Sequence, residues 1–236
     1  ILSERDLYAL QRLSLKQVST AIRAAPDAAT LRAVAADIHR FARNLLGQGV
    51  GAKQLTELIS HLNDVLTARL VALVAAQHSM DMTRACWLAF GSEGRGEQTI
   101  ATDQDNAIIF PDREGEDREA VRARLLAFAD EVNRSLDACG FPLCKGNIMA
   151  RNPSWCLSLK EWFDRFDDWI RNSDPEALLN ASIFFDFRRV GGQLDLEPLE
   201  QILARAAQRP VFLRLLAKDA LLQFRMQALH FELRQL

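Results

Sequence analysis

The stretch that decides the fold reads Trp87-Leu-Ala-Phe-Gly-Ser-Glu-Gly-Arg-Gly-Glu-Gln-Thr-Ile-Ala-Thr-Asp-Gln-Asp-Asn-Ala-Ile-Ile-Phe110. It contains, in order, a short apolar run, a Gly-Ser turn, a small polar segment and two aspartates that open a second apolar run. Residues 86–90 predict a buried strand that ends at the turn signal Gly91-Ser92. Residues 106–110 predict a second strand, so the stretch encodes two strands joined by a short polar segment.

Two aspartates stand at the start of the second predicted strand. Asp103 and Asp105 lie two residues apart, so the period-2 geometry of a strand directs both carboxylates to one face. Like charges at that distance repel each other, and a divalent cation between them relieves the repulsion. Hard oxygen ligands with open positions for phosphate and water suit Mg²⁺, with Mn²⁺ as an alternative. The simpler interpretation of the pair is a solvated strand end.

The Gly-Ser turn predicts the other half of a site. Ser92 is a good helix N-cap, and residues 93–98 are long enough for about a helical turn and a half. A glycine before a helix lets a ligand approach the backbone, and the free N–H groups there favour an anion. Alone it could be only a turn. With the aspartate pair ten residues further on, it predicts a metal–nucleotide site, though not a Walker loop, because no Gly-Lys-Ser/Thr follows Gly91.

These residues carry a resemblance. Gly91-Ser92, the spacer and Asp103-x-Asp105 resemble the signature of the DNA polymerase β-type nucleotidyltransferase superfamily. The fuller string Gly-Ser-Glu-Gly-Arg-Gly-Glu…Thr-Asp-Gln-Asp-Asn resembles the nucleotidyltransferase domains attached to cystathionine-β-synthase (CBS) domains in bacterial signalling proteins. Those domains are related to the PII-protein uridylyltransferases. The resemblance covers most of the chain and continues through residues 140–151, Trp155, Trp169-Ile170 and residues 184–188.

The resemblance implies an α+β fold, in which a small mixed β-sheet nucleotidyltransferase core is flanked by N-terminal helices and a C-terminal helical bundle. We expect an N-terminal helical segment over 1–80, the core over 81–155 and a helical substrate-binding domain over 156–236. The string Ile-Leu-Ser-Glu-Arg-Asp-Leu at residues 1–7 resembles the end of a CBS domain, which implies CBS domains upstream in the full-length protein. Its simpler interpretation is a capped helix start with Ser3 as N-cap.

The implied reaction is Mg²⁺-dependent transfer of a nucleoside monophosphate from a nucleoside triphosphate to an acceptor. By analogy with the uridylyltransferases, the acceptor is a protein and the role is signal transduction. A homodimer is left open. The alternative is a non-catalytic nucleotide-sensing or interaction module within a CBS-regulated protein. The intact Gly-Ser turn and the paired aspartates favour the enzyme, whereas the absence of a third acid favours the sensing module.

The superfamily's third carboxylate is missing where it is expected. Residues 141–150 predict a third strand, which in the superfamily commonly carries that acid, but Leu143-Cys-Lys-Gly-Asn147 contains none. Asp186 is the candidate substitute as a catalytic acid. Its alternative is a structural ion pair with Arg188 or Arg189.

Two basic residues are candidates for phosphate binding. Arg95 could reach a phosphate as a planar fork, or pair with Glu93 or Glu97 at the surface. Lys145 could meet a phosphate from the segment that lacks the third acid. The nucleotide-binding candidates are therefore Gly91, Ser92, Arg95 and Lys145.

The composition is that of an ordinary globular protein, with 236 residues, 49% hydrophobic and 25% charged. The 29 basic and 31 acidic residues give a formal net charge of −2, which argues against a nucleic-acid partner. No apolar run approaches the roughly eighteen residues of a membrane span, and no signal peptide is visible. We expect a cytoplasmic protein without a membrane partner, whose cysteines are reduced core residues: Cys86, Cys139, Cys144 and Cys156.

Helical patterns dominate the rest of the chain. They predict a helix capped by Asp27, another from about Ala52, a long amphipathic helix over 118–138, a helix opened by Asp174-Pro175 and ended by Gly191-Gly192, and two more over 197–208 and 211–236. The wide apolar stripes predict that the helices of 27–78 pack against the C-terminal helices.

Overall fold

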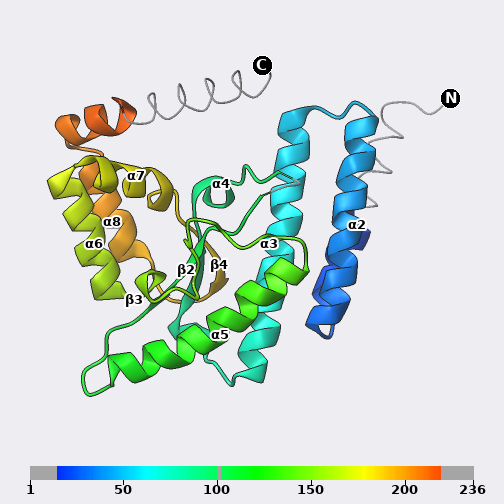
Figure 1. Ribbon diagram of the computed structural model, residues 1–236, viewed down its shortest axis with the longest axis horizontal. Coiled ribbons are helices and arrows are strands. Elements are labelled where there is room, and N and C mark those ends of the chain that lie inside the picture. Colours follow the sequence, from blue (N-terminus) through cyan, green and yellow to red (C-terminus); the bar gives the residue numbers. More distant parts are fainter. Residues whose placement is uncertain (1–14, 100–101, 219–236) are drawn as a thin grey trace.

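The computed structural model describes residues 15–99 and 102–218. It is an α+β protein built on a four-stranded sheet with strand order β3-β2-β1-β4 (Figure 1). The sequence-based prediction of a small mixed sheet flanked by helices is therefore confirmed. The proposed CBS-like tail at residues 1–7 and the predicted helix beyond residue 218 lie outside the described residues.

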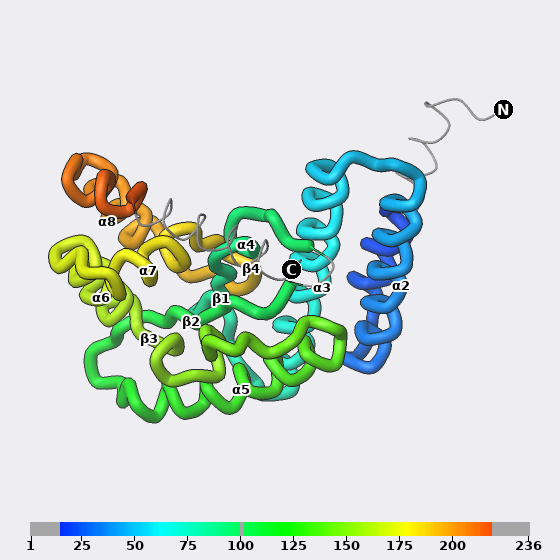
Figure 2. Tube along the Cα trace, turned by 45° about the horizontal axis from the view of Figure 1, so that its top comes forward, coloured from blue at the N-terminus to red at the C-terminus, as the bar shows by residue number. Residues whose placement is uncertain are grey.

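The described chain begins with a helical segment at residues 15–24, and two long helices follow it. Helix α2 spans Ala28–Gly47 and α3 spans Ala52–Gln77. The Asp27 side chain accepts a hydrogen bond of 2.7 Å from the Thr30 N–H, as expected for an N-cap. In Figures 1 and 2 the two helices lie side by side, with α3 next to the sheet.

Helix α3 is long and apolar enough to cross a membrane by length and composition, with a mean hydropathy of 1.4 in its 18-residue window. This candidate was not expected from the sequence, because Asn63, Asp64 and Arg69 interrupt its apolar run. Of that window, 61% is buried inside the protein. Its leucines and valines pack against α2, the sheet and α5, so α3 is a core helix in this fold.

The strands alternate with the remaining helices. β1 pairs antiparallel with β2 on one side and with β4 on the other, and β2 pairs parallel with β3. The elements after α3 are, in chain order, η1 (Met82–Arg84), β1 (Cys86–Ala89), α4 (Gly91–Gly94), β2 (Asn106–Phe110), α5 (Arg118–Ala138), η2 (Pro153–Trp155), β3 (Cys156–Ser158), α6 (Leu159–Asn172), α7 (Pro175–Phe184), β4 (Arg188–Gly192) and α8 (Glu197–Ala206).

The predicted third strand over 141–150 is wrong. These residues form a loop of turns and bends, and the third strand is instead β3, a few residues later. Pro142 has no N–H to donate to a ladder, and Asn147 takes a left-handed φ of 56°. Both features suit a loop rather than a strand.

The predicted end of the helix that begins at Asp174-Pro175 is also wrong. Helix α7 stops at Phe184, and Arg188–Gly192 forms the edge strand β4. Gly192 takes a φ of +89°, and a Cβ on it would collide with the Ala85 carbonyl oxygen. A glycine is therefore required for β4 to approach the chain ahead of β1 this closely.

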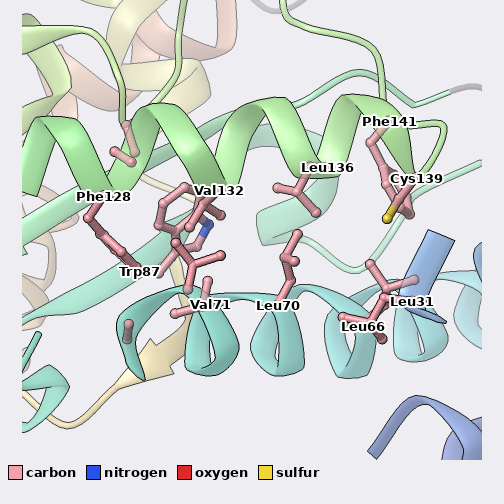
Figure 3. Close-up of a cluster of buried hydrophobic side chains, with 14 of the residues drawn as sticks. Leu31, Leu66, Leu70, Val71, Trp87, Phe128, Val132, Leu136, Cys139 and Phe141 are labelled. Carbon is pink, nitrogen blue, oxygen red and sulfur yellow. The ribbon is translucent and has the colours of Figure 1, made fainter. Parts of the chain in front are cut away.

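The sheet separates two hydrophobic cores. Alternate strand residues face opposite ways, so Trp87 and Ile108 join one core while Leu88 and Ile109 join the other. Figure 3 shows the first core, where side chains of α3 and α5 pack against Trp87 of β1 and Leu31 of α2. The second core is lined by α6, α7 and α8 and is rich in aromatic side chains.

This arrangement overturns one prediction. The apolar stripes of α2 and α3 do not pack into a common core with those of α6–α8, because the two sets cover opposite faces of the sheet. The sheet, which seemed too small to cover both stripes, is wide enough once β4 joins it.

Candidate functional site

The polypeptide turns sharply at the end of β1. Phe90 takes the N-cap position and Gly91, with φ +54°, is the first residue of α4. The prediction of Ser92 as N-cap is wrong, because Ser92 lies one residue inside the helix. The predicted helix over 93–98 is also too long: α4 ends at Gly94, and Gly96 with φ +67° turns the chain away.

This turn presents free backbone donors. Within α4 the first helical hydrogen bond runs from the Gly94 N–H to the Phe90 carbonyl at 2.9 Å. Among the described residues, no acceptor is bonded to the N–H groups of Gly91, Ser92 and Glu93. Successive free N–H groups around a left-handed residue form a concave site that favours an anion.

The aspartate pair lies against this turn. Asp103 and Asp105 precede β2, whose regular ladder begins at Asn106. The Phe90 N–H donates to the Asp105 carbonyl at 3.0 Å. A Cβ placed on Gly91 would lie 3.5 Å from Asp105 Oδ2. The free N–H groups and a carboxylate are thus adjacent, which joins the two halves of the site predicted from the sequence.

The surroundings of the two aspartates disfavour the negative charge of Asp105. Burial raises the pKa of Asp105, and the neighbouring Asp103 carboxylate raises it further, while a hydrogen bond from the Cys144 thiol lowers it. Asp103 itself is exposed. In the described parts of the chain neither carboxylate forms an ion pair, so the negative charge of the pair is not neutralised by a basic side chain.

These donors fit Mg²⁺ or Mn²⁺. Two carboxylates beside free N–H groups leave room for phosphate oxygens and water, which complete the ligand shell of hard cations. Over residues 15–99 and 102–218, no group of three or more His, Cys, Asp or Glu side chains is placed to hold a metal. Asp186 therefore does not join Asp103 and Asp105 in a three-acid group.

A buried amide network supports the segment that carries the pair. Asn133 of α5 donates from Nδ2 to Gln104 Oε1 at 2.7 Å and to Asn106 Oδ1 at 2.9 Å. Its own Oδ1 accepts the Arg151 N–H at 3.0 Å. Gln104 and Asn106 flank Asp105, so the network fixes the backbone on both sides of that carboxylate.

The same network ties down the loop over 141–151. Gln104 Nε2 donates to the Phe141 carbonyl at 2.7 Å, and Asn106 Oδ1 accepts the Ala150 N–H at 2.9 Å. The loop is thereby held at both ends beside Asp105. It carries Cys144, whose thiol bonds to Asp105, and next to it the exposed Lys145.

Arg95 and Asp186 are brought together by the structure. Arg95 Nε donates to Glu97 Oε2 at 2.8 Å, and Nη1 donates to Asp186 Oδ2 at 2.8 Å. Of the two interpretations of Arg95, the structure shows pairing, with Glu97 but not Glu93. Asp186 pairs with Arg95 rather than with Arg188 or Arg189.

Three residues of the site region were missed by the sequence analysis. They are Glu93 of α4, Asp64 of α3 and Arg188 of β4; Arg188 pairs with the Asp64 carboxylate and donates to the Glu93 main-chain carbonyl. Burial, together with the carboxylates of Asp64 and Asp105, raises the pKa of Glu93 to about 8, although the neighbouring Arg188 acts to lower it. Glu93 lies inside the quoted motif and could have been suspected. Asp64 gave no signal beyond being a charge in a leucine-rich helix.

The mixed sheet, with a glycine turn and a carboxylate pair at one end, has the form of a nucleotidyltransferase-like domain. Residues 36–176 match the family described as "Putative nucleotidyltransferase DUF294", and the chain belongs to this family. The match spans more than half of the chain and includes α4, both aspartates and the loop over 141–151, but ends before Asp186 and Arg188. No curated protein matches the chain in a sequence search.

Proposed function

We propose that this protein is a Mg²⁺-dependent nucleotidyltransferase that moves a nucleoside monophosphate from a nucleoside triphosphate to a hydroxyl of an acceptor, most simply a protein side chain. One observation carries the proposal: the N–H groups that begin at Gly91 lie next to the carboxylate of Asp105, and within the described chain these N–H groups have no bonded acceptor and the carboxylate has no ion-pair partner. A triphosphate with its cation needs both an anion cradle and hard anionic ligands in one place.

Each group has a role in this chemistry. The N–H groups of the Gly91-Ser92 turn would bind the outer phosphates, and Asp103 and Asp105 would hold the cation. When bound, Mg²⁺ or Mn²⁺ would neutralise phosphate charge and orient the triphosphate. The acceptor oxygen attacks the α-phosphorus, the bond from that phosphorus to the bridging oxygen breaks, and pyrophosphate leaves. Such transfer depends mainly on positioning and charge stabilisation, which fixed backbone dipoles provide.

The hydroxyl proton must pass to a base, and Asp186 remains the candidate. Its carboxylate is held in place by Arg95, which would orient it beside α4. Lys145, exposed on the loop that is tied to the Asp105 segment, is the candidate for contacting the leaving pyrophosphate. Arg95 would have to break its ion pair with Glu97 or Asp186 to bind a phosphate, so Lys145 is the better candidate for a phosphate ligand.

The wider setting is proposed from the resemblance. Helices α6–α8 would bind the acceptor, and α7 lies next to α4 (Figure 2). We place the protein in the cytoplasm, in signal transduction with upstream CBS domains, by analogy with uridylyltransferase-like proteins. A homodimer fits this setting but has no particular contact to support it.

A second function has one observation in its favour. The loop over 141–151, where the third carboxylate was expected from the sequence, presents the Cys144 thiol to Asp105 instead. A site built this way could bind a metal–nucleotide complex without transferring it. The protein would then be a nucleotide-sensing module.

A single experiment separates these functions. Pyrophosphate release is measured with each of the four nucleoside triphosphates, with Mg²⁺ or with EDTA, and with α-phosphate-labelled nucleotide and candidate acceptor proteins. The transferase predicts Mg²⁺-dependent release and labelled acceptor, both lost in Asp105→Asn. Binding of Mg²⁺–nucleotide without release in any combination would favour the sensing module.

A further inference from the structure

One arginine connects the N-terminal helices to the proposed nucleotide site. Arg188, the first residue of β4, forms a two-pronged ion pair with Asp64 of α3, with Nη1 to Oδ2 at 2.7 Å and Nη2 to Oδ1 at 2.9 Å. The two residues are 124 positions apart in the sequence. Both side chains are largely shielded, with 34% and 25% of their surfaces exposed. Paired forks of this kind fix geometry as well as charge.

The same guanidinium also holds α4. Arg188 Nη2 donates to the Glu93 carbonyl at 2.8 Å, and Nε donates to the Gly94 carbonyl at 3.2 Å. Arg188 therefore bonds both to α3 and to the turn that begins at Gly91 beside Asp105. In Figure 2, α4 lies between α3 and α7 at one end of the sheet.

Packing behind α4 leaves it little freedom. A Cβ on Gly94 would collide with the carbonyl oxygen of Asp186, so α4 rests directly on the chain that leads into β4. The Glu93 side chain is 5% exposed and lies under the turn. Because N–H and C=O groups of a helical turn point in opposite directions along its axis, carbonyls held by Arg188 leave the N–H groups of Gly91 and Ser92 at the opposite end.

We propose that Arg188 and Asp64 are positioning residues for nucleotide binding, which hold α4 so that its free N–H groups stay beside Asp105. The inference rests on the proposed function, since it assigns the turn to the phosphates. Neither residue touches the nucleotide in this account. Asp64 acts through Arg188, and α3 thereby becomes part of the nucleotide site.

The competing explanation is that the ion pair only stabilises the packing of α3 against β4. Arg188→Lys separates the two, because lysine keeps a positive charge opposite Asp64 but lacks the planar fork that serves a carboxylate and two carbonyls together. Arg189→Lys is the matched control, being the same substitution at the next position, which is exposed and on the opposite face of the strand. Asp64→Asn and the double variant complete a mutant cycle.

The test measures three quantities on each variant: the Kd of Mg²⁺–nucleoside triphosphate, the thermal midpoint, and hydrogen exchange of the amides over 90–95 without nucleotide. We expect Arg188→Lys to weaken triphosphate binding about tenfold or more, with faster exchange over 90–95 and a small change in Tm. Asp64→Asn should act in the same direction, and the double variant should be less than additive. Arg189→Lys should match the wild type.

Two results would overturn the inference. One is a lower Tm in Arg188→Lys with unchanged Kd, which would show that the pair stabilises the fold but does not position α4 for nucleotide binding. The other is unchanged exchange over 90–95. If the wild type bound no Mg²⁺–nucleotide at all, the proposed function would fall, and the exchange measurement would still decide whether Arg188 holds α4: faster exchange would support that role and unchanged exchange would refute it.

Discussion

Charged residues lie at both ends of β2, but their surroundings differ. Beyond its last residue, Phe110, the loop over 111–118 lines a cavity of about 540 Å³. There Asp112 accepts the Lys160 N–H at 2.8 Å, Arg118 reaches Glu161 at 3.4 Å and Arg84 pairs with Glu116 at 2.9 Å. Ahead of its first residue, Asp103 and Asp105 have no ion-pair partner in the described chain.

This difference teaches that hollow shape and chemical function need not coincide. At the far end of β2 acidic and basic side chains form ion pairs with one another, so several of the charges around the cavity already have a partner. At the near end two like charges lie close together with no basic partner among residues 15–99 and 102–218, beside N–H groups that have no bonded acceptor in the same part of the chain. Charge that the fold leaves uncompensated is the better indicator of where a cation and phosphates bind.

The largest expected effect removes one charge from the near end. Asp103→Asn and Asp105→Asn should each reduce Mg²⁺-dependent pyrophosphate release at least about 100-fold, because a neutral amide is a poor ligand for a hard cation. Asp112→Asn at the far end should leave release within about twofold of the wild type. Steady-state assays at saturating Mg²⁺ provide the measurement. Equal losses at both ends would remove the distinction between them.

A smaller effect on nucleotide affinity is expected from a side chain added at the Gly91 turn. Gly91→Ala and Gly96→Ala both place a Cβ on a residue with positive φ, at +54° and +67°, so each should lose about 1 kcal/mol of stability. Only the Cβ at Gly91 would lie near Asp105, 3.5 Å from Oδ2, whereas Gly96 has open space. Gly91→Ala should therefore bind Mg²⁺–nucleotide about tenfold more weakly than Gly96→Ala. Similar affinities in the two variants would count against a ligand at Gly91.

The buried Glu93, which lies close to the near end of β2, should make the stability of the protein depend on pH. Its pKa is raised from 4.5 to about 8 in the folded protein, so between these values the folded state binds more protons than the unfolded state. Stability should thus fall as pH rises from about 5 to 8, by at most about 1.4 kcal/mol per pH unit, and level off above. Glu93→Gln should flatten this slope. Urea unfolding at several pH values, in EDTA, is the measurement, and an unchanged slope in the variant would contradict the assignment.

The smallest effect concerns stability without metal. Asp112→Ala loses an acceptor for the first turn of α6 and should cost about 1 kcal/mol. Asp103→Ala should cost nothing or stabilise by roughly 0.5 kcal/mol or less, since it relieves repulsion at an exposed position. Chemical unfolding in EDTA compares the two. A clear destabilisation by Asp103→Ala would mean that this carboxylate has a structural partner.

Much of the fold could be predicted from the sequence because its signals are local. Asp27 and Asp174 cap their helices as expected, and α5 has the predicted bounds Arg118–Ala138. The strand β4 could not be predicted in this way. Its sequence Arg-Arg-Val-Gly-Gly shows no apolar alternation, and it is a strand because β1 offers it a partner edge. Tertiary pairing decided that segment, not propensity.

The site was predictable only in part, for the same reason. The spacing of the Gly91 turn and the aspartates predicts that they belong to neighbouring strands, and the structure sets them side by side. The partners of Arg95 and Arg188 depend on contacts between distant segments. Asp64 and Arg188, for example, are 124 positions apart in the sequence, so no local pattern could connect them.

The most direct test of the account is calorimetric titration of each nucleoside triphosphate into the wild-type protein, with Mg²⁺ and with EDTA, repeated with Asp105→Asn. The account predicts saturable binding of at least one triphosphate that requires Mg²⁺ and is lost in the variant, while the variant keeps the wild-type circular dichroism spectrum. Binding that is equally strong in EDTA, or equally strong in Asp105→Asn, would contradict the claim that the uncompensated carboxylates hold a metal–nucleotide complex.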